Sequence, residues 1–270
     1  PCIILDLQCT RSPLSTVGMN VNTGTASFTI NIERTVSAEY FSFTTSDAEY
    51  NVLCKIRSMP NSAYLLDNAD FALGIVTGNN KEYISDIKNE NNEMILKGAD
   101  ICKYHITRTN NYIVFKPENF QQAAPTEMYR SPEKLLYRFI SSQLVFAYDD
   151  KQTLSLNSCN IVIPRLPGIK IKYVLAILNS RIAQFIYKKE FNSVKVLRSH
   201  IENIPIPTAD ASTQAEIIAL TDKLISGLQA AEAEKVYDEL DLLVSKAFNL
   251  DSNEIEIINK AVEGDNKFLA

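Results

Sequence analysis

Hydrophobic and polar side chains alternate over much of residues 1–57, as in "ASFTINIERTV" and "YFSFTTSDAEYNVL". A period of two combined with many Thr and Ser residues is typical of strands and turns. From about residue 58 to 165, short apolar runs such as "NYIVFK", "LVFAYDD" and "CNIVIPRL" are separated by glycines and prolines. These runs predict short strands joined by turns.

The pattern changes to a helical period from residue 171 onward. In 171–189, apolar side chains fall on one helical face: Val174, Leu178, Ile182, Phe185 and Ile186. After "IPIP" (204–207), which must be extended because of its prolines, three further helices are expected. Their apolar positions are Ile217, Leu220, Leu224 and Leu228, then Leu240, Leu243, Val244 and Phe248, then Ile255 and Ile258. Thr213 with Glu216, and Asp251 with Glu254, have the spacing of capping boxes.

These patterns predict an α+β protein in three parts. Residues 1–57 form a β-rich segment, 58–207 form a domain built on a mixed β-sheet, and 208–270 form a helical C-terminal module. Because the chain starts at Pro1 and runs directly into "PCIILDL", which resembles a strand, we expect it to be cut from a longer protein.

The overall charge of −5 hides an uneven distribution. Residues 131–207 carry eleven basic and five acidic side chains, whereas 208–270 carry five basic and thirteen acidic ones. A positive central segment is suited to phosphates, although lysines and arginines on solvated faces would explain it equally well. The five cysteines lack CxxC spacing and the two histidines match no zinc pattern, so reduced thiols and no metal site are expected. No apolar run is long enough to cross a bilayer, so no membrane partner is expected.

The stretch "GIVTGNNKEY" (74–83) has some features of a phosphate-binding loop. A P-loop needs four residues between its glycines and a lysine directly after the second. Here three residues separate Gly74 from Gly78, and two asparagines precede Lys81. The alternatives left open are a tight turn between two strands and a turn that presents polar side chains to a larger ligand.

Several blocks then occur in a fixed order: "GIVTGNNKEYI", "LKGADICKYHI", "YIVFKP", "EKLLYRFISSQLVFAYDD", "LNSCNIVI", "KYVLAILNSRIAQFIYKK", "HIENIPIP" and "YDELDLLVSKAFNLDSNEIEII". This order resembles the TaqI-like C-terminal specificity domain, or target recognition domain. That domain occurs in type II DNA adenine-N6 methyltransferases and in fused restriction–modification enzymes of the Eco57I type. The resemblance covers about 60–258.

The resemblance implies a module that reads a short sequence in double-stranded DNA, in the cytoplasm of a bacterium. It also implies a separate N-terminal methyltransferase domain in the same polypeptide, which would use S-adenosylmethionine, and Mg²⁺ if a nuclease domain is present. The family's catalytic Asn/Asp-Pro-Pro-Tyr motif and its glycine-rich methyl-donor motif are missing from these 270 residues. No catalytic residue is therefore expected in this chain.

On this reading, DNA contacts fall on three groups of residues. The first is the turn with Thr77, Gly78, Asn79, Asn80 and Lys81. The second is Lys97 with Lys103 and Tyr104. For this second group, a strand-connecting turn with Tyr104 in the core is the open alternative. The third comprises Lys134, Lys188, Lys189, Lys195 and Arg198, where the last four would equally complement a helix dipole.

Five further residues are expected to have structural roles. Arg138 is expected to pair with Asp149 and not to reach DNA. Asn179, beside Ser180, interrupts an apolar helix and is expected to satisfy neighbouring backbone groups. Pro205 and Pro207 are expected to fix the direction of the chain.

Two other classes remain open on the sequence. One is a fragment of the specificity subunit of a type I restriction system, and the other is a protein-interaction module that docks through its acidic helices. A stand-alone hydrolase is disfavoured because no nucleophile, base and orienting residue can be assembled around the two histidines.

Overall fold

The computed structural model describes residues 16–22, 27–34, 45–107 and 109–264. It divides into two compact units, Pro1–Asn51 and Val52–Ala270. In the first unit, β1 (Asn20–Asn22) pairs antiparallel with β2 (Ser27–Thr29). The strand expected at "PCIILDL" lies outside the described residues.

The helix α1 (Asp47–Arg57) occupies a stretch for which strands were expected. Two bonds close a capping box at its start: the Ser46 N–H donates to the Glu49 carboxylate (2.8 Å), and the Glu49 N–H donates to the Ser46 hydroxyl (3.4 Å). The helix then buries Val52, Leu53 and Ile56, which are spaced for one helical face. The expectation of strands is wrong here, because the "SDAE" segment caps a helix at this point.

The described residues of the second unit form three sheets. The first has the strand order β4-β11-β8-β9, with every neighbouring pair antiparallel. Its strands are β4 (Ala69–Ala72), β8 (Lys134–Arg138), β9 (Phe146–Asp149) and β11 (Cys159–Pro164).

The second sheet has the order β10-β6-β7-β5, in which β10 and β6 are parallel and the other pairs antiparallel. Its strands are β5 (Ile84–Ser85), β6 (Glu93–Leu96), β7 (Tyr112–Ile113) and β10 (Leu154–Ser155). A third, small sheet pairs β3 (Ser62–Ala63) with β12 (Ile206–Pro207).

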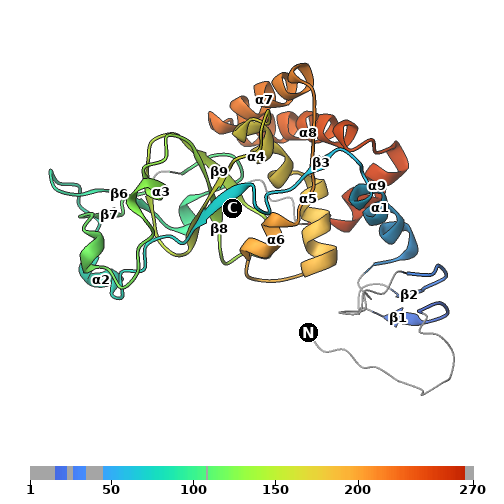
Figure 1. Ribbon diagram of the computed structural model, residues 1–270, viewed down its shortest axis with the longest axis horizontal. Helices are drawn as coiled ribbons and strands as arrows, with labels where there is room; N and C mark the ends of the chain where they lie inside the picture. The colour runs from blue at the N-terminus through green and yellow to red at the C-terminus, as the bar shows by residue number, and fades with distance from the viewer. Residues whose placement is uncertain (1–15, 23–26, 35–44, 108, 265–270) are drawn as a thin grey trace. The chain divides into compact units, whose positions relative to one another are not determined.

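The first sheet is covered on both faces. Successive side chains of a strand point to opposite sides, so neighbouring residues enter different cores. Leu135 and Tyr137 of β8 belong to the larger hydrophobic cluster, which we call the helix-side core, together with α4 and α7. Leu136, between them, belongs to the smaller cluster, the sheet-side core, which the second sheet completes. Figure 1 shows this order: α4, α5, α7 and α8 lie on one side of β8 and β9, and β6, β7 and α2 lie on the other.

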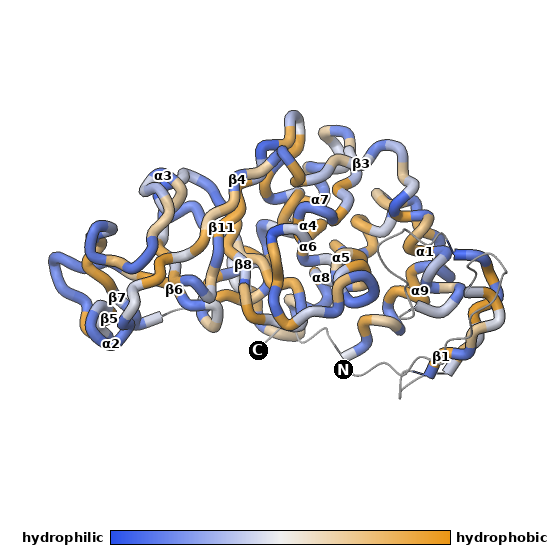
Figure 2. Tube along the Cα trace, turned by 60° about the horizontal axis from the view of Figure 1, so that its bottom comes forward, coloured by the Kyte–Doolittle hydropathy of each residue, from blue (hydrophilic) through white to orange (hydrophobic). Residues whose placement is uncertain are grey.

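The long helices after residue 170 follow the predicted periodicity, with one interruption. The predicted helix over 171–189 divides at Ser180 into α4 (Ile171–Asn179) and α5 (Arg181–Ile186), followed by the π-helical turn η3 (Tyr187–Phe191). Every residue of α4 from Tyr173 onward is buried. Figure 2 shows the hydropathy of the residues along the chain. The remaining helical elements are α2 (Asn80–Tyr83), η1 (Gly98–Asp100), η2 (Pro117–Asn119), α3 (Thr126–Tyr129), α6 (Arg198–Glu202), α7 (Ala211–Ile225), α8 (Ala230–Ala247) and α9 (Ser252–Ala261).

The C-terminal helices α7, α8 and α9 appear where the sequence predicts helices. Asp251 and Glu254 close the predicted capping box of α9. At α7, however, the cap is Asp210, whose carboxylate accepts a bond from the Thr213 N–H at 2.8 Å. Thr213 lies inside the helix, so the capping box predicted with Glu216 is wrong. The division predicted at residue 207 stays a prediction, and α7 packs against α4 within the second unit.

Candidate nucleic-acid interface

The loop around Gly78 starts from a short extended segment held on both sides by backbone hydrogen bonds. On one side, the Ile75 N–H donates to the Ser155 carbonyl (2.7 Å), and the Asn157 N–H donates to the Ile75 carbonyl (3.1 Å). On the other side, Val76 and Gln122 exchange two bonds of 2.9 and 3.0 Å. The loop therefore leaves the sheet between two fixed segments, one near residue 157 and the other near residue 121.

The two glycines of this stretch have different reasons to be glycine. At Gly74 a Cβ atom would lie 2.1 Å from the Leu156 carbonyl oxygen, so only glycine permits this close backbone approach. Gly78 has φ +84°, a left-handed conformation that other residues adopt only with strain. Gly74 thus sets the packing of the loop against residue 156, and Gly78 sets its turn.

The turn differs in part from the strand-to-strand connection considered above. After Gly78 the chain makes the single helical turn α2 before β5 begins. The buried Thr77 hydroxyl donates to the Asn80 side-chain oxygen at 2.6 Å, and the Asn79 amide donates to the Glu82 carboxylate at 3.4 Å. Asn79, Asn80 and Lys81 are exposed. The turn therefore presents its polar side chains to solvent.

A hollow of about 340 Å³ lies beside this turn, and we call it the Gly78 hollow. Three separate segments of the chain line it: Val76, Thr77, Gly78, Asn79, Asn80 and Lys81 from the loop, Gln121 after η2, and Asn157 after β10. Sequence reasoning identified the loop but missed Gln121 and Asn157, because nothing in the sequence places residues about 40 and 80 positions further on beside Gly78. Amide side chains therefore dominate the polar groups of this hollow.

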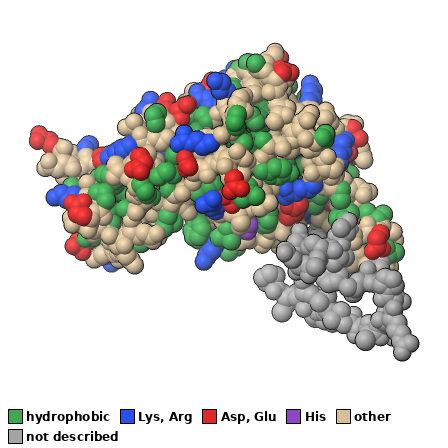
Figure 3. Space-filling view, in the orientation of Figure 1, with side chains coloured by type: hydrophobic (Ala, Val, Ile, Leu, Met, Phe, Trp, Pro, Cys, Tyr) green, Lys and Arg blue, Asp and Glu red, His purple; other side chains and the backbone are tan. Residues whose placement is uncertain are grey.

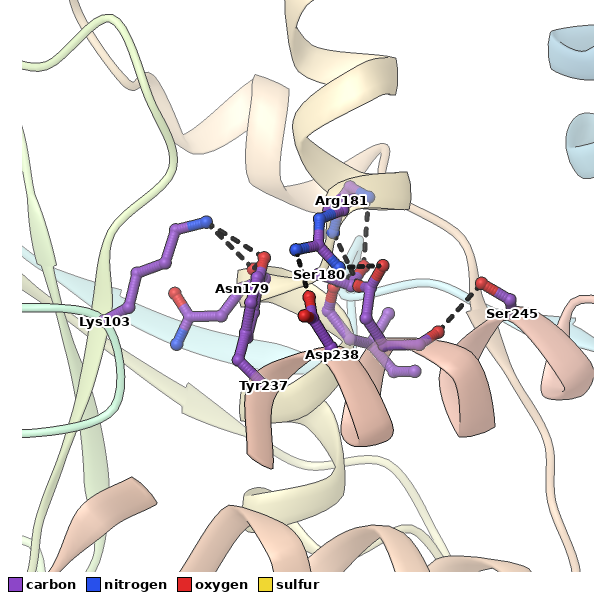
Figure 4. A network of polar contacts seen from close by, with 10 residues as sticks. Lys103, Asn179, Ser180, Arg181, Tyr237, Asp238 and Ser245 are labelled. Carbon is purple, nitrogen blue, oxygen red and sulfur yellow. Dashed lines mark hydrogen bonds and ion pairs between the residues drawn. The ribbon is translucent and has the colours of Figure 1, made fainter. Parts of the chain in front are cut away.

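The second predicted group, Lys97 with Lys103 and Tyr104, is not brought together on the surface. Lys97 is half-buried, and its ammonium donates to the Asn111 side chain at 2.7 Å. Lys103 is only 4% exposed and its ammonium donates to the Asn179 carbonyl at 3.1 Å and to the Tyr237 hydroxyl at 3.3 Å. Figure 4 shows Lys103 pointing toward Asn179 and Tyr237. The prediction that Lys103 contacts DNA is therefore wrong.

Tyr104 is also a core residue. It is fully buried, and its ring packs edge-on against Tyr237 with centroids 6.2 Å apart. Its backbone pairs with β9, where its N–H donates to the Phe146 carbonyl at 2.7 Å. Burial raises the pKa of Tyr104 well above its usual value. The alternative left open by the sequence, Tyr104 in the core, is the one the structure shows.

Lys134 is fully buried as well. Its ammonium forms an ion pair with Asp149, directly opposite it in the β8–β9 register, and donates to the Tyr129 carbonyl at 2.8 Å. Burial lowers the pKa of Lys134, and the Asp149 charge opposes that shift. The prediction of a phosphate contact by Lys134 is wrong, because its charge is neutralised inside the sheet.

Arg138 has a structural role, but with a partner other than the one predicted. Its guanidinium donates twice to the Ile101 carbonyl, at 2.9 and 2.6 Å. Asp149 is in β9, opposite Lys134 at the other end of β8, and pairs with Lys134. Strand register explains the exchange of partners, because residue 134, and not residue 138, faces residue 149.

The other four residues of the third predicted group lie around η3 and α6. Lys188 and Lys189 are half-buried on η3, whereas Lys195 and Arg198 are exposed. Arg198 forms an ion pair with Glu202 at 2.7 Å and lies over the Phe71 ring. On the face of the molecule shown in Figure 3, lysines and arginines alternate with acidic side chains and do not form one continuous basic area. Lys195 is therefore the simplest candidate for a phosphate contact in this group.

The polar break at Asn179 and Ser180 satisfies backbone groups. Asn179 accepts from the Phe146 N–H (3.0 Å) and donates to the Phe146 carbonyl (2.9 Å), so it acts as an extra strand residue beside β9. The Ser180 hydroxyl caps α5 by accepting from the Ala183 N–H at 3.1 Å. Pro207 pairs with β3 and its carbonyl accepts from the Tyr173 hydroxyl at 3.0 Å, and Pro205 directly precedes β12.

Within 16–22, 27–34, 45–107 and 109–264, no group of three or more His, Cys, Asp or Glu side chains is arranged to hold a metal ion. In the same part of the chain, no helix combines the length and the apolar character needed to span a bilayer.

Solved structures similar to this chain come from restriction–modification systems. The type IIG restriction endonuclease BpuSI matches with TM-score 0.50 and 12% identity, over 81% of this chain and 32% of its own. The type IIL enzyme MmeI, solved in complex with DNA, matches with TM-score 0.47 and 10% identity, over 79% of this chain and 36% of its own. The HsdS subunit from Thermoanaerobacter tengcongensis matches with TM-score 0.38 and 15% identity over 75% and 51%. The chain thus spans about a third to a half of the length of these proteins, and the BpuSI match supports the fold alone.

Sequence comparison places the family on the central part of the chain. None of the curated proteins is significantly similar to this sequence. The family model of the TaqI-like C-terminal specificity domain matches residues 93–206, which include β6 to β12, the buried Lys134–Asp149 pair and the helices α4 and α5. Residues 93–206 of this chain are therefore similar to the TaqI-like C-terminal specificity domain.

Proposed function

We propose that this chain is the DNA target recognition module of a restriction–modification protein. The observation that carries the proposal is the Gly78 hollow: exposed amides and one lysine, held by backbone pairing at the edge of a fold that contains the specificity domain. Side chains of this kind read base edges in a groove, whereas cations such as Lys195 set position by contacting phosphates.

The proposal extends to the rest of the protein. An N-terminal domain of the same polypeptide methylates adenine N6 with S-adenosylmethionine, and a nuclease domain, if present, uses Mg²⁺. The catalytic motifs of that chemistry are missing from residues 1–270, so the proposed division of labour assigns recognition to this chain and methyl transfer to the other domain. Such a protein acts on bacterial DNA in the cytoplasm.

Binding of the 270-residue chain to DNA tests the proposal directly. Fluorescence anisotropy with a random-sequence duplex pool should show binding that weakens linearly in log–log form as salt rises, because neutralised phosphates release counterions. Repeated selection from the pool should then enrich a short common sequence. Failure to bind any duplex at about 50 mM salt, by a chain shown to be folded by circular dichroism, would overturn the proposal.

A further inference from the structure

We propose that the Gly78 hollow reads the major-groove edge of an adenine, and that Gln121 and Asn157 take part in this reading together with Asn79 and Asn80. This inference rests on the proposed function and names the base that one site recognises. It also assigns a role to two residues that lie far from the loop in the sequence.

The chemistry of the lining favours adenine over guanine. Four amides from three segments line the hollow, and one lysine stands with them. An amide carries a donor and an acceptor side by side, which matches the N6 amino group and the N7 acceptor of adenine. Guanine presents two acceptors, O6 and N7, and is read best by a cation with paired donors. The lining contains four amides but only one cation, Lys81.

A phosphate is a poor occupant of the same hollow. Lys81 is the one cation among the lining residues, and the Glu82 carboxylate accepts a hydrogen bond from the amide of the lining residue Asn79 at 3.4 Å. A carboxylate at this position repels a backbone phosphate, whose negative charge is held by cations or by several backbone N–H groups. The electrostatics therefore suit a neutral, polar ligand edge.

A base turned out of the duplex is also a poor fit. Pockets for extruded bases stack the base between aromatic or apolar side chains. The eight residues that line the Gly78 hollow include no aromatic ring, and Val76 is their one large apolar side chain. An edge-on contact from amides, with the base still stacked in the duplex, requires no such platform.

The framework fixes the spacing of the amides. Residues 75 and 76 form backbone hydrogen bonds to residues 155–157 on one side and to Gln122 on the other. The backbone at Gln121 and at Asn157 is therefore held in place relative to the loop. Gly78 lies against Gln121, since a Cβ atom built on it would be 3.4 Å from the Gln121 Cβ. Within the loop, the Thr77 hydroxyl occupies the Asn80 side-chain oxygen and leaves the Asn80 amide group to donate. Pre-set donors of this kind reduce the ordering cost of recognition.

Base analogues test the inference. The duplex selected by the 270-residue chain is prepared with 7-deazaadenine at each adenine in turn, and with 7-deazaguanine at each guanine. Loss of N7 at one adenine is expected to weaken binding by about ten-fold. Gln121→Ala and Asn157→Ala should bind the unmodified duplex more weakly and should lose most of that ten-fold discrimination, with an unchanged melting temperature.

The chain offers a matched control next to Gln121. Gln122 is also an exposed glutamine, but it contributes only its backbone to the framework, through its bonds with Val76. Gln122→Ala should therefore retain both affinity and discrimination. If Gln121→Ala and Gln122→Ala behave alike, the assignment of Gln121 is overturned.

The outcomes separate this inference from the proposed function. If the chain selects no duplex, the proposed function fails. If it selects one but every 7-deazaadenine duplex binds normally and the Gln121 and Asn157 variants keep full affinity, the function stands and the adenine reading fails. If only a 7-deazaguanine position matters and the loss disappears in the Lys81→Met variant, the hollow reads guanine and the inference is overturned.

Discussion

The Gly78 hollow and the interior around Lys103 and Lys134 contain the same kinds of residue with opposite surroundings. At the hollow, Asn79, Asn80 and Lys81 are exposed on a turn. In the interior, Lys103 is 4% exposed and Lys134 fully buried, each bonded to acceptors inside the protein. The sequence marks all of these residues as candidates for DNA contact.

The comparison shows that a lysine in a sequence block does not reveal which way it faces. Lys134 lies on a strand whose two faces are both covered, so its ammonium must find a partner inside the protein, and Asp149 is that partner. Lys81 lies on a short turn after the loop and is exposed. The number of layers packed against an element therefore decides whether its cations support the fold or meet a ligand.

The largest expected effect comes from breaking the buried pair. Lys134→Met leaves the Asp149 carboxylate buried without its cation and should lower the free energy of unfolding by about 3–5 kcal/mol. Lys81→Met, on the exposed turn, should change it by less than about 0.5 kcal/mol. Urea unfolding followed by circular dichroism measures both. A Lys134→Met variant that is fully stable but binds DNA with a smaller salt dependence would show that Lys134 contacts a phosphate after all.

The two glycines of the loop provide the next contrast. Gly74→Ala places a Cβ atom against the Leu156 carbonyl and should cost about 3 kcal/mol, because the backbone pairing beside it must open. Gly78→Ala should cost only about 1–2 kcal/mol, the strain of a left-handed residue. Thermal and urea unfolding should rank the variants in that order. A larger loss at Gly78 than at Gly74 would show that the turn, and not the close approach, holds the loop.

The hydroxyl of Tyr237 tests the interior network on a smaller scale. It donates to the Asn179 carbonyl at 2.9 Å and accepts from Lys103 (Figure 4). Tyr237→Phe should lower the free energy of unfolding by about 1.5–3 kcal/mol, since one of the lost bonds involves a charged donor. DNA affinity should be unchanged once the variant is compared at a temperature where it is folded. Reduced affinity in the fully folded variant would mean that the network also shapes the DNA surface.

The smallest effect is expected at Lys195. Lys195→Ala should leave stability unchanged and should reduce the slope of log affinity against log salt by about 1, as the loss of one phosphate contact does. Lys260 on α9 is an exposed lysine in the acidic module and pairs with Glu256 at 2.8 Å, which makes Lys260→Ala a suitable control. Equal slopes for both variants and the parent chain would remove Lys195 from the interface.

The sequence by itself determined the fold class and the type of several elements in the second unit, including its C-terminal helices. Short apolar runs between turn residues predicted the strands that contain residues 112–113, 146–149 and 159–164. The helical period predicted α7, α8, α9 and the helix that divides into α4 and α5. The order of the blocks also identified the specificity domain. These features are encoded locally, because a strand or helix repeats its pattern every two or about 3.6 residues.

Only the tertiary structure decided which polar residues are available to a ligand. The facing of Lys134 depends on the β8–β9 register and on the layers on both sides of that sheet, and the burial of Lys103 depends on Tyr237, 134 positions later in the chain. The Gly78 hollow likewise needs residues 121 and 157 to come to one place through backbone pairing. The periodicity of hydrophobic residues indicates which face of one element is buried. The exposure of a side chain at a site depends on several elements packed together, and a single sequence does not specify that packing.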